Sequence, residues 1–327
     1  MAKSGAPRHG SMQYWPRKRA SREHARVRTW ASSTVSDKST LLGFAGYKVG
    51  MTHTMAVDNR PKHLTKGDTI AMPVTIVECP DIVILGLNAY KKENGALKIA
   101  KTIMSDKSNK NLKRTLVENK QKHDLSSIER MTKIVEIRAL VHTQPYKTNL
   151  GKKKPEVFEI SLGGNVNAQI EFMKNNLGKE IPVNEVLKEG QLVDIHAVTK
   201  GKGFQGPVKR FGVGLRQHKA EKVKRGPGSL GPWRGQGHVM YRVAHAGQMG
   251  YHTRTFYNSW IVKLGDKVAD INTKEGFRAY GVLKNKYLLF KGSLPGPAKR
   301  LLKFTAPMRP NKKVPTQAPQ MEIMINK

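Results

Sequence analysis

Apolar residues fall along this chain in short runs that predict β-strands more often than helices. A β-branched run bounded by prolines covers residues 73–77, and further apolar runs cover 41–49 and 81–90. Such runs, with turn residues at each end, are typical of strands. We therefore expect the ordered body to begin near Leu41 with several strands over residues 41–90.

The middle of the chain mixes two periodicities. Residues 133–143 alternate between apolar and polar and predict a strand, and residues 157–162 predict a second. Residues 167–177 carry apolar side chains at near-helical spacing, and the polar stretch 110–123 is expected to be helical in part. This combination indicates an α+β insert beside the first sheet.

Strand patterns return over residues 191–198 and between 260 and 290, where residues 286–290 before Gly292 indicate a closing hairpin. The tail after Lys291 is rich in proline and is expected to be extended. The apolar tail residues that we expect to dock are Leu301, Leu302 and Phe304. Many short strands with little helix favour a β-barrel body.

The distribution of charge along the chain adds most to this prediction of a β body. The chain of 327 residues has 59 Lys and Arg against 24 Asp and Glu, a formal net charge of +35. Residues 1–30, 199–260 and 291–327 each hold a single acid, whereas residues 151–198 are nearly neutral. An excess of this size implies a polyanionic partner. We expect the three basic segments to be irregular chain that orders on that partner.

The internal basic segment is a predicted loop of about 60 residues, a length that usually indicates either a wrong assignment or a functional loop. Its charge favours a functional loop. It holds twelve glycines between positions 200 and 260, with cations and aromatic rings spaced among them. Cations meet phosphates, rings stack on unpaired bases and glycines allow close approach, so the loop suits folded RNA. Trp233 has no apolar neighbour beyond Pro232 and favours an RNA or loop-tip contact, whereas Tyr241 and Phe256 fit a local core equally well.

Residues 201–206 match the dinucleotide-binding pattern G-x-G-x-x-G. That site also needs a helix opening at the third glycine and an acid about 20 residues further on. Pro207 follows at once, the only nearby acid is Glu221, and we expect no such helix. The glycines more plausibly let the backbone approach something closely.

Other catalytic and metal chemistry is not indicated. The loop histidines at 218, 238, 245 and 252 have spacings that match no zinc pattern, and the single cysteine, Cys79, lies in an apolar run. No run approaches the ~18 apolar residues of a membrane span, and the basic N-terminus is not a signal peptide. These features predict a non-enzymatic protein of a reducing compartment such as the cytoplasm.

Several motifs occur in order between about residue 43 and residue 297. They are G-Y-K-V-G-M-T (46–52), T-K-G-K-G-F-Q-G (199–206) followed by K-R (209–210), R-G-P-G-S-L-G (225–231), A-G-Q-M-G (246–250) and G-S-L-P-G (292–296). Through these motifs the chain resembles the universal large-subunit ribosomal protein family three, in its archaeal and eukaryotic branch.

The resemblance implies a mainly β fold with an α+β insert: a translation-factor-like Greek-key β-barrel with long irregular basic extensions. It implies binding near the 3′ end of the large-subunit ribosomal RNA, early assembly, and a loop and arm that reach toward the peptidyl transferase centre. Trp233 matches the tryptophan at that loop's tip. The implied partners are this RNA and neighbouring ribosomal proteins including family fourteen. No membrane, small-molecule substrate or second copy of the chain is expected.

We divide the chain into seven segments. They are a basic arm (1–40), a first barrel segment (41–90), the insert (91–180), a second barrel segment (181–200), the central basic loop (201–258), a third barrel segment (259–292) and a tail (293–327). No cofactor is expected, beyond Mg²⁺ or monovalent ions that the RNA itself binds.

The candidate RNA-binding residues are cations, rings and polar side chains of these segments. They are Arg8, Trp15, Arg17, Lys18, Arg19, Arg22, Lys48, Lys200, Lys202, Phe204, Lys209, Arg210, Arg216, His218, Lys224, Arg225, Trp233, Arg234, Arg242, His245, Gln248, Arg254 and Arg300. Two alternatives remain at this point: a nicotinamide-dependent enzyme built on residues 201–206, and a free-standing RNA-binding regulator. Co-sedimentation with ribosomal subunits at high salt separates the ribosomal hypothesis from the regulator.

Overall fold

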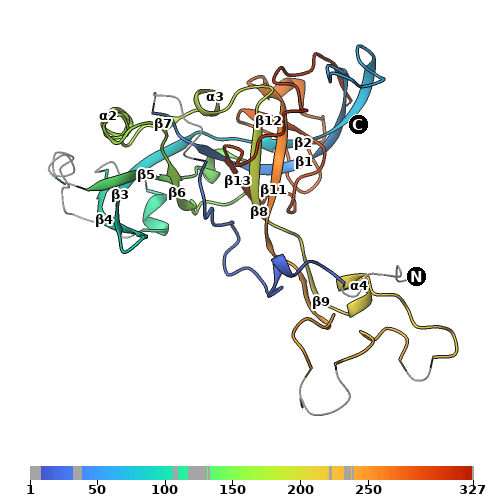
Figure 1. The fold of residues 1–327 in the computed structure, drawn as a ribbon. Helices are drawn as coiled ribbons and strands as arrows, with labels where there is room; N and C mark the ends of the chain where they lie inside the picture. The colour runs from blue at the N-terminus through green and yellow to red at the C-terminus, as the bar shows by residue number, and fades with distance from the viewer. Residues whose placement is uncertain are drawn as a thin grey trace. The chain divides into compact units, whose positions relative to one another are not determined.

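The computed structural model forms two compact units, each continuous in space but not in sequence (Figure 1). The arm–loop unit consists of residues 1–23 and 198–254, and the barrel unit of residues 24–197 and 255–327. The structure describes residues 9–31, 39–105, 110–116, 131, 133–220, 223–231, 237 and 239–325.

The main sheet of the barrel unit closes into a ring. Its strands are β1 (Gly43–Val57), β2 (Thr69–Glu78), β8 (Leu192–Val198), β11 (Thr253–Gly265), β12 (Tyr287–Lys291), β13 (Leu301–Thr305) and β14 (Met321–Ile325). The order is β13-β8-β11-β12-β2-β1-β14, and β13 pairs with β1 as well as with β8. This second pairing leaves β14 outside the ring, on the far half of β1. The expectation of a mainly β body is confirmed.

Two short strands of this sheet, β12 and β13, are buried on both faces. All five residues of β13 and the first four of β12 are buried, and the rings of Phe290 and Phe304 pack with centroids 5.2 Å apart. Because both faces are buried, Tyr287–Phe290 is a continuous apolar run without alternation, whereas β13 also buries Lys303 and Thr305. Gly43 on β1 permits a close approach of two strands, since a Cβ there would lie 2.4 Å from the carbonyl oxygen of Phe304 on β13.

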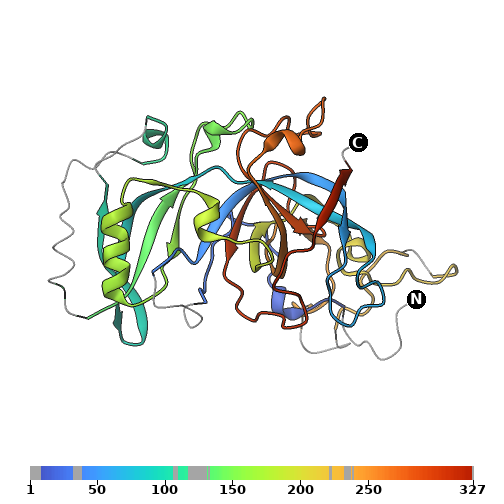
Figure 2. The same ribbon diagram turned by 90° about the horizontal axis from the view of Figure 1, so that it is seen from above.

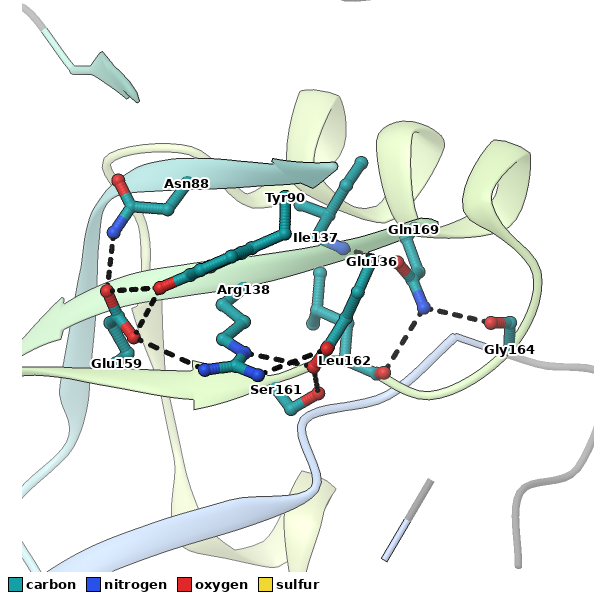
Figure 3. Close-up of polar contacts among 10 residues, drawn as sticks. All are labelled: Asn88, Tyr90, Glu136, Ile137, Arg138, Glu159, Ser161, Leu162, Gly164 and Gln169. Atoms are coloured by element: carbon teal, nitrogen blue, oxygen red, sulfur yellow. Dashed lines mark hydrogen bonds and ion pairs between the residues drawn. The ribbon is translucent and has the colours of Figure 1, made fainter. Parts of the chain in front are cut away.

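The insert is a second sheet with one helix across it. Its strands are β3 (Ile82–Glu93), β4 (Ala96–Met104), β5 (Ile134–His142), β6 (Val157–Ser161) and β7 (Glu180–Ile181), in the order β4-β3-β5-β6 with β7 on β3. Figure 2 shows helix α2 (Val166–Asn176) lying across one face of this sheet. Gln169 fastens α2: its amide donates to the carbonyls of Leu162 and Gly164, and its oxygen accepts from Ile137 N–H (Figure 3).

The insert also carries a polar network drawn in Figure 3. Arg138 lies between two carboxylates, 3.0 Å from Glu136 and 3.7 Å from Glu159. Its guanidinium also stacks 4.4 Å over the ring of Tyr90. Glu159 in turn accepts from the amide of Asn88 and the hydroxyl of Tyr90. These charges compensate one another, so this network does not carry the basic excess of the chain.

Short elements complete the barrel unit. They are α3 (Val183–Val186) and the 3-10 helices η3 (Leu112–Arg114), η4 (Pro145–Lys147) and η5 (Val268–Asp270). The strands expected at 133–143, 157–162 and 191–198 and the helix expected at 167–177 are confirmed. Of the helix expected within 110–123, the described portion is only the turn of η3, and residues 117–123 lie outside the described residues.

Four features differ from the sequence-based expectations. Strand β4 was not predicted, because its lysines hide the apolar positions of a half-exposed edge strand. β3 belongs to the insert's sheet and not to the ring. The closing hairpin at 286–292 is wrong, since β12 pairs with β11 and β2 and not with the chain that follows Gly292. The tail is not merely extended: β13 within it closes the ring.

No helix among the described residues has the length and apolar character needed to cross a membrane. Cys79 is fully buried, and burial raises the pKa of its thiol well above the ordinary value. It therefore serves as a small core side chain.

Candidate nucleic-acid interface

The arm–loop unit concentrates positive charge. Its two sequence segments contain eighteen Lys and Arg against two acids, Glu23 and Glu221. About half of the formal net charge of +35 therefore belongs to a unit of 80 residues. Charge of one sign at this density attracts a polyanion strongly.

The base of the central loop has regular structure. β9 (Gly201–Gln205) pairs antiparallel with β10 (Gly247–Gly250), and helix α4 (Pro207–Phe211) follows β9. Gly250 is required here, because its φ is +71° and a Cβ would lie 2.0 Å from the carbonyl oxygen of Lys200. The expectation of a wholly irregular loop is thus wrong at its base, where a tight glycine crossing lets the two strands pair.

The expectation that no helix opens at the third glycine is also wrong. α4 starts directly after Gly206, with Pro207 at its first position, where the fixed φ of proline suits a helix start. α4 has only five residues, however, and the described partner of β9 is an antiparallel strand. A dinucleotide site needs a parallel β-α-β unit, so the geometry still opposes the enzyme alternative.

The N-terminal arm docks on this base. The ring of Trp15 packs against Phe211 at 5.7 Å and edge-on against Tyr241 at 6.0 Å. Ala20 N–H donates to the carbonyl of Tyr251 at 2.8 Å, and His252 Nδ1 lies 2.9 Å from the carbonyl of Lys18. Because a carbonyl only accepts, Nδ1 carries the proton. Arm and loop therefore form one folded body before any RNA is bound.

Arg210 is the main polar link within this body. Its guanidinium donates to the carbonyls of Gln248 at 3.0 Å, His245 at 2.8 Å and Arg17 at 3.2 Å. Arg17 donates back to the carbonyl of Arg210 at 3.4 Å. The fork of five N–H groups lets one arginine join three chain segments, a task for which lysine is unsuited.

These internal cations crowd one another. Arg17 and Arg210 both lie over the ring of Phe211, at 4.3 Å and 5.0 Å from its centroid. Burial first and then the charge of Arg17 lower the pKa of the Arg210 guanidinium from its ordinary value. Arg254 stacks 4.5 Å over Tyr14, and the same two causes lower its pKa. The ring faces and carbonyls hold cations together where no carboxylate does, and an RNA phosphate would relieve their repulsion.

Burial lowers the pKa of His252, and the charges of Arg254, Arg210 and Arg17 lower it further. Its neutral imidazole matches the hydrogen bond to Lys18 that fastens the arm. His252 is therefore a structural residue of the arm–loop unit.

The predicted RNA-binding residues of this unit fall into two groups. The exposed ones offer their side chains to a partner: Lys18, Arg19, Arg22, Lys200, Lys202, Phe204, Lys209, Arg216, His218, Lys224, Arg225 and Arg242. Phe204 is the clearest ring among them, with 77% of its surface exposed.

The second group is partly buried and holds the unit together: Trp15, Arg17, Arg210, His245, Gln248 and Arg254. The amide of Gln248, for example, donates to the carbonyls of Met249 and Gly250 in its own strand. Three further predicted residues, Arg8, Trp233 and Arg234, lie outside the described residues.

Two predicted residues belong to the barrel unit. Lys48 is buried, and its ammonium donates to the carbonyls of Leu294 at 2.6 Å and Gly296 at 3.1 Å. Arg300 is partly buried, and its carbonyl accepts from Lys48 N–H. The G-Y-K-V-G-M-T and G-S-L-P-G motifs thus meet in the barrel, where Lys48 braces a turn and is not presented to solvent.

Tyr14, Phe211, Tyr241 and His252 take part in the arm–loop unit but were not among the predicted site residues. Their partners, such as Trp15 for Phe211 and Lys18 for His252, lie more than 190 residues away, so no local spacing reveals them. The only usable signal was the interleaving of aromatic residues with cations in both segments. Within the described residues of the chain, no cluster of three or more His, Cys, Asp or Glu forms.

Comparison with known proteins places these features in a family. The sequence matches the family described as "Ribosomal protein L3" over residues 1–325. It is 42% identical over 322 residues to the large ribosomal subunit protein uL3 of Methanobrevibacter smithii, covering 96% of this chain and 95% of that protein. The protein of the same name from Methanosphaera stadtmanae is 46% identical, with 92% and 91% covered, and that from Nanoarchaeum equitans is 45% identical, with 94% and 93% covered.

Proposed function

The chain belongs to the ribosomal protein L3 family, and from this premise we propose that its arm–loop unit binds ribosomal RNA within the large ribosomal subunit. The members of this family are structural ribosomal proteins and not enzymes, and the relatives are of archaeal type. The chain is accordingly a component of a ribonucleoprotein that serves translation.

One observation carries the proposal: among the described residues of the arm–loop unit, fourteen cations and one acid are arranged on a body that is already folded. Arg210 and His252 use their N–H groups within the protein, whereas Lys200, Lys202 and Lys209 remain exposed. A folded base lowers the ordering cost of binding, because the cations need not be positioned at the moment of contact. The exposed set is therefore the proposed RNA-contacting surface.

The finer elements of the proposal rest on the family motifs. We place the contact near the 3′ end of the large-subunit RNA, early in assembly, in the cytoplasm and beside ribosomal protein family fourteen. The ring of strands is taken as a translation-factor-like Greek-key barrel that anchors one copy of the chain. The loop, with Trp233 toward its tip, extends toward the peptidyl transferase centre.

Crosslinking followed by sequencing of the bound RNA tests the proposal in cells. The wild type is compared with a variant in which Arg216, Lys224 and Arg225 are changed to Gln, which leaves the docked base intact. We expect reads concentrated on the large-subunit RNA, and a selective loss near the peptidyl transferase centre in the variant. Reads scattered over messenger RNA would favour the regulator and refute the ribosomal assignment.

A second experiment addresses the loop tip. Trp233→Ala is expected to leave subunit assembly largely intact but to slow peptide bond formation. Unchanged rates of peptide bond formation and factor binding in that variant would contradict the proposed reach of the loop.

A further inference from the structure

A buried carboxylate in the barrel unit fastens two segments that carry exposed rings and cations. Asp194 on β8 is 1% exposed, and its two oxygens accept from different chain segments. Oδ1 accepts from Asn258 N–H at 2.8 Å, and Oδ2 accepts from Met308 N–H at 3.0 Å. β8 lies between β11 and β13 (Figure 1), so this one side chain ties β11, at Asn258, to the chain that leaves β13.

Asn258 extends the connection. Its φ is +54°, a conformation in which asparagine is among the few tolerated non-glycine residues. Its amide donates to the carbonyl of Arg309 at 2.9 Å, and its oxygen accepts from Asn311 N–H at 3.3 Å. Residues 308–311 are thereby held against β11 by both Asp194 and Asn258.

The fastened segments expose aromatic side chains. Phe256 and Tyr257, which directly precede Asn258, are 45% and 59% exposed. Met308 on the tail is 44% exposed. Two rings that are consecutive in the sequence are therefore exposed where the backbone is held by hydrogen bonds, whereas many other rings of this unit, such as Phe290 and Phe304, are buried.

The tail segment supplies charge of one sign. Arg309, Lys312 and Lys313 are exposed, and the sequence has no acid between residues 276 and 321. Lys313 N–H is held by the side chain of Asn311. This local positive field matches a polyanion and opposes a second copy of this chain, whose own net charge is +35.

We propose that Phe256, Tyr257, Arg309, Lys312 and Lys313 form a second RNA-contact surface, in the barrel unit and separate from the exposed cations of the arm–loop unit. The rings stack on unpaired bases, and the tail cations contact the flanking phosphates. Asp194 and Asn258 touch no RNA; they position the two segments. The inference rests on the proposed ribosomal RNA binding and adds a site to it.

The test uses the full-length chain and protein-free large-subunit RNA, with hydroxyl-radical footprinting and a salt titration of binding. One variant carries Phe256→Ala and Tyr257→Ala, and another changes Arg309, Lys312 and Lys313 to Gln. Because these side chains are exposed, the variants should fold. The matched control removes three exposed cations elsewhere in the barrel unit, Lys188, Lys267 and Lys274, by the same change to Gln.

We expect both surface variants to lose the same patch of RNA protection, while the control keeps it. The aromatic variant should bind on the order of 5-fold to 100-fold more weakly, the usual effect of removing a stacking ring. The tail variant should flatten the dependence of binding on salt by about 0.7 to 0.9 for each phosphate that it no longer neutralises, and more than the control does.

The inference is overturned if both variants keep every protection, or if assembled subunits instead show a neighbouring protein crosslinked to Phe256 or Tyr257. Failure of the proposed function looks different. In that case, the wild type would protect no region of the large-subunit RNA, and changing Arg216, Lys224 and Arg225 of the arm–loop unit to Gln would leave the footprint unchanged.

Discussion

Arg17 and Arg210 each donate a guanidinium N–H to the other's backbone carbonyl, although 193 residues separate them in the chain. Both guanidinium groups also lie over Phe211. Two like charges are held together by carbonyl acceptors and a ring face in place of carboxylates. The arm is thus joined to the loop through groups that RNA need not supply.

Arg210→Lys should release the arm while keeping the charge. A lysine ammonium is a point donor and does not span the three carbonyls that the guanidinium joins. Loss of these bonds is worth about 1–3 kcal/mol, so hydrogen exchange at the Ala20 amide, which bonds to Tyr251, should accelerate roughly 5-fold to 150-fold. Lys209→Gln, at an exposed neighbour, is the control. Equal exchange in both variants would show that Arg210 does not hold the arm.

Lys48 should matter for stability and not for RNA contact. Lys48→Met keeps the aliphatic volume but leaves the carbonyls of Leu294 and Gly296 without their buried donor. We expect the free energy of unfolding, measured by denaturant titration, to fall by about 2 kcal/mol. The salt dependence of RNA binding should stay unchanged.

The matched comparison is Lys202→Met at an exposed position of β9. This variant should show the opposite pattern, with unchanged unfolding and a shallower dependence of RNA binding on salt. A shallower salt dependence in Lys48→Met would restore Lys48 as an RNA ligand.

Local pattern explains which features the sequence predicted. The alternation of residues 133–143 and the near-helical spacing of 167–177 report a buried face within one element, and β5 and α2 follow. Lys48 and Arg210 illustrate the limit. Both cations belong to the motifs that carry the family resemblance and look like RNA ligands, because the sequence shows charge but not which carbonyls a cation meets after folding.

The closure of the ring of strands by β13 could not be predicted from local sequence either. β13 is only five residues, Leu301–Thr305, and follows a proline- and glycine-rich stretch. Nothing in its own pattern indicates that it pairs with β1, some 250 residues earlier, and with β8. The docking of Leu301, Leu302 and Phe304 was expected from their apolar character, and their burial is confirmed.

Acidification should destabilise the barrel unit through His196. This imidazole lies between the hydroxyls of Thr255 and Thr305, at 3.0 and 3.2 Å. Burial lowers its pKa from the ordinary 6.5; the charge of Lys303 lowers it too, and Asp194 opposes them. A lowered folded-state pKa means that the unfolded chain takes up the proton first. The stabilisation is complete above about pH 6.5 and is lost as the pH falls through the folded-state pKa.

Unfolding of the purified chain at pH 7.5, 6.5, 5.5 and 5.0 measures this effect. Burial also lowers the pKa of His142 and His252, so the wild type should lose stability steadily below pH 6.5. His196→Gln, which can still bond to a hydroxyl, should be less stable at pH 7.5 but should lose less on acidification. An identical pH dependence in the variant would exclude His196 as a contributor.

Glu78 should be the most sensitive polar residue of the barrel unit. Its carboxylate is fully buried and accepts from the hydroxyl of Tyr280 at 2.5 Å, from Lys284 N–H at 3.0 Å, and from the backbone and side-chain N–H groups of Asn285 at 2.9 and 2.8 Å. Burial and the charge of Glu78 raise the pKa of Tyr280 far above its ordinary value, so this hydroxyl stays a donor. The end of β2 thereby holds the chain that leads into β12.

Different substitutions at this position should be graded in effect. Glu78→Ala leaves four donors without an acceptor, and we expect a loss of at least about 3 kcal/mol. Glu78→Gln keeps the oxygen that accepts three of them, and the Tyr280 hydroxyl can rotate to accept from the new amide, so the loss should be nearer to about 1–2 kcal/mol. Tyr280→Phe should cost a similar amount, and combining it with Glu78→Gln should cost less than the sum, since both remove the same bond.

Denaturant unfolding of the four variants, with exposed Glu275→Gln as the control, measures this order. A Glu78→Ala protein that unfolds at the wild-type midpoint would mean that the segment before β12 is held by its apolar contacts alone.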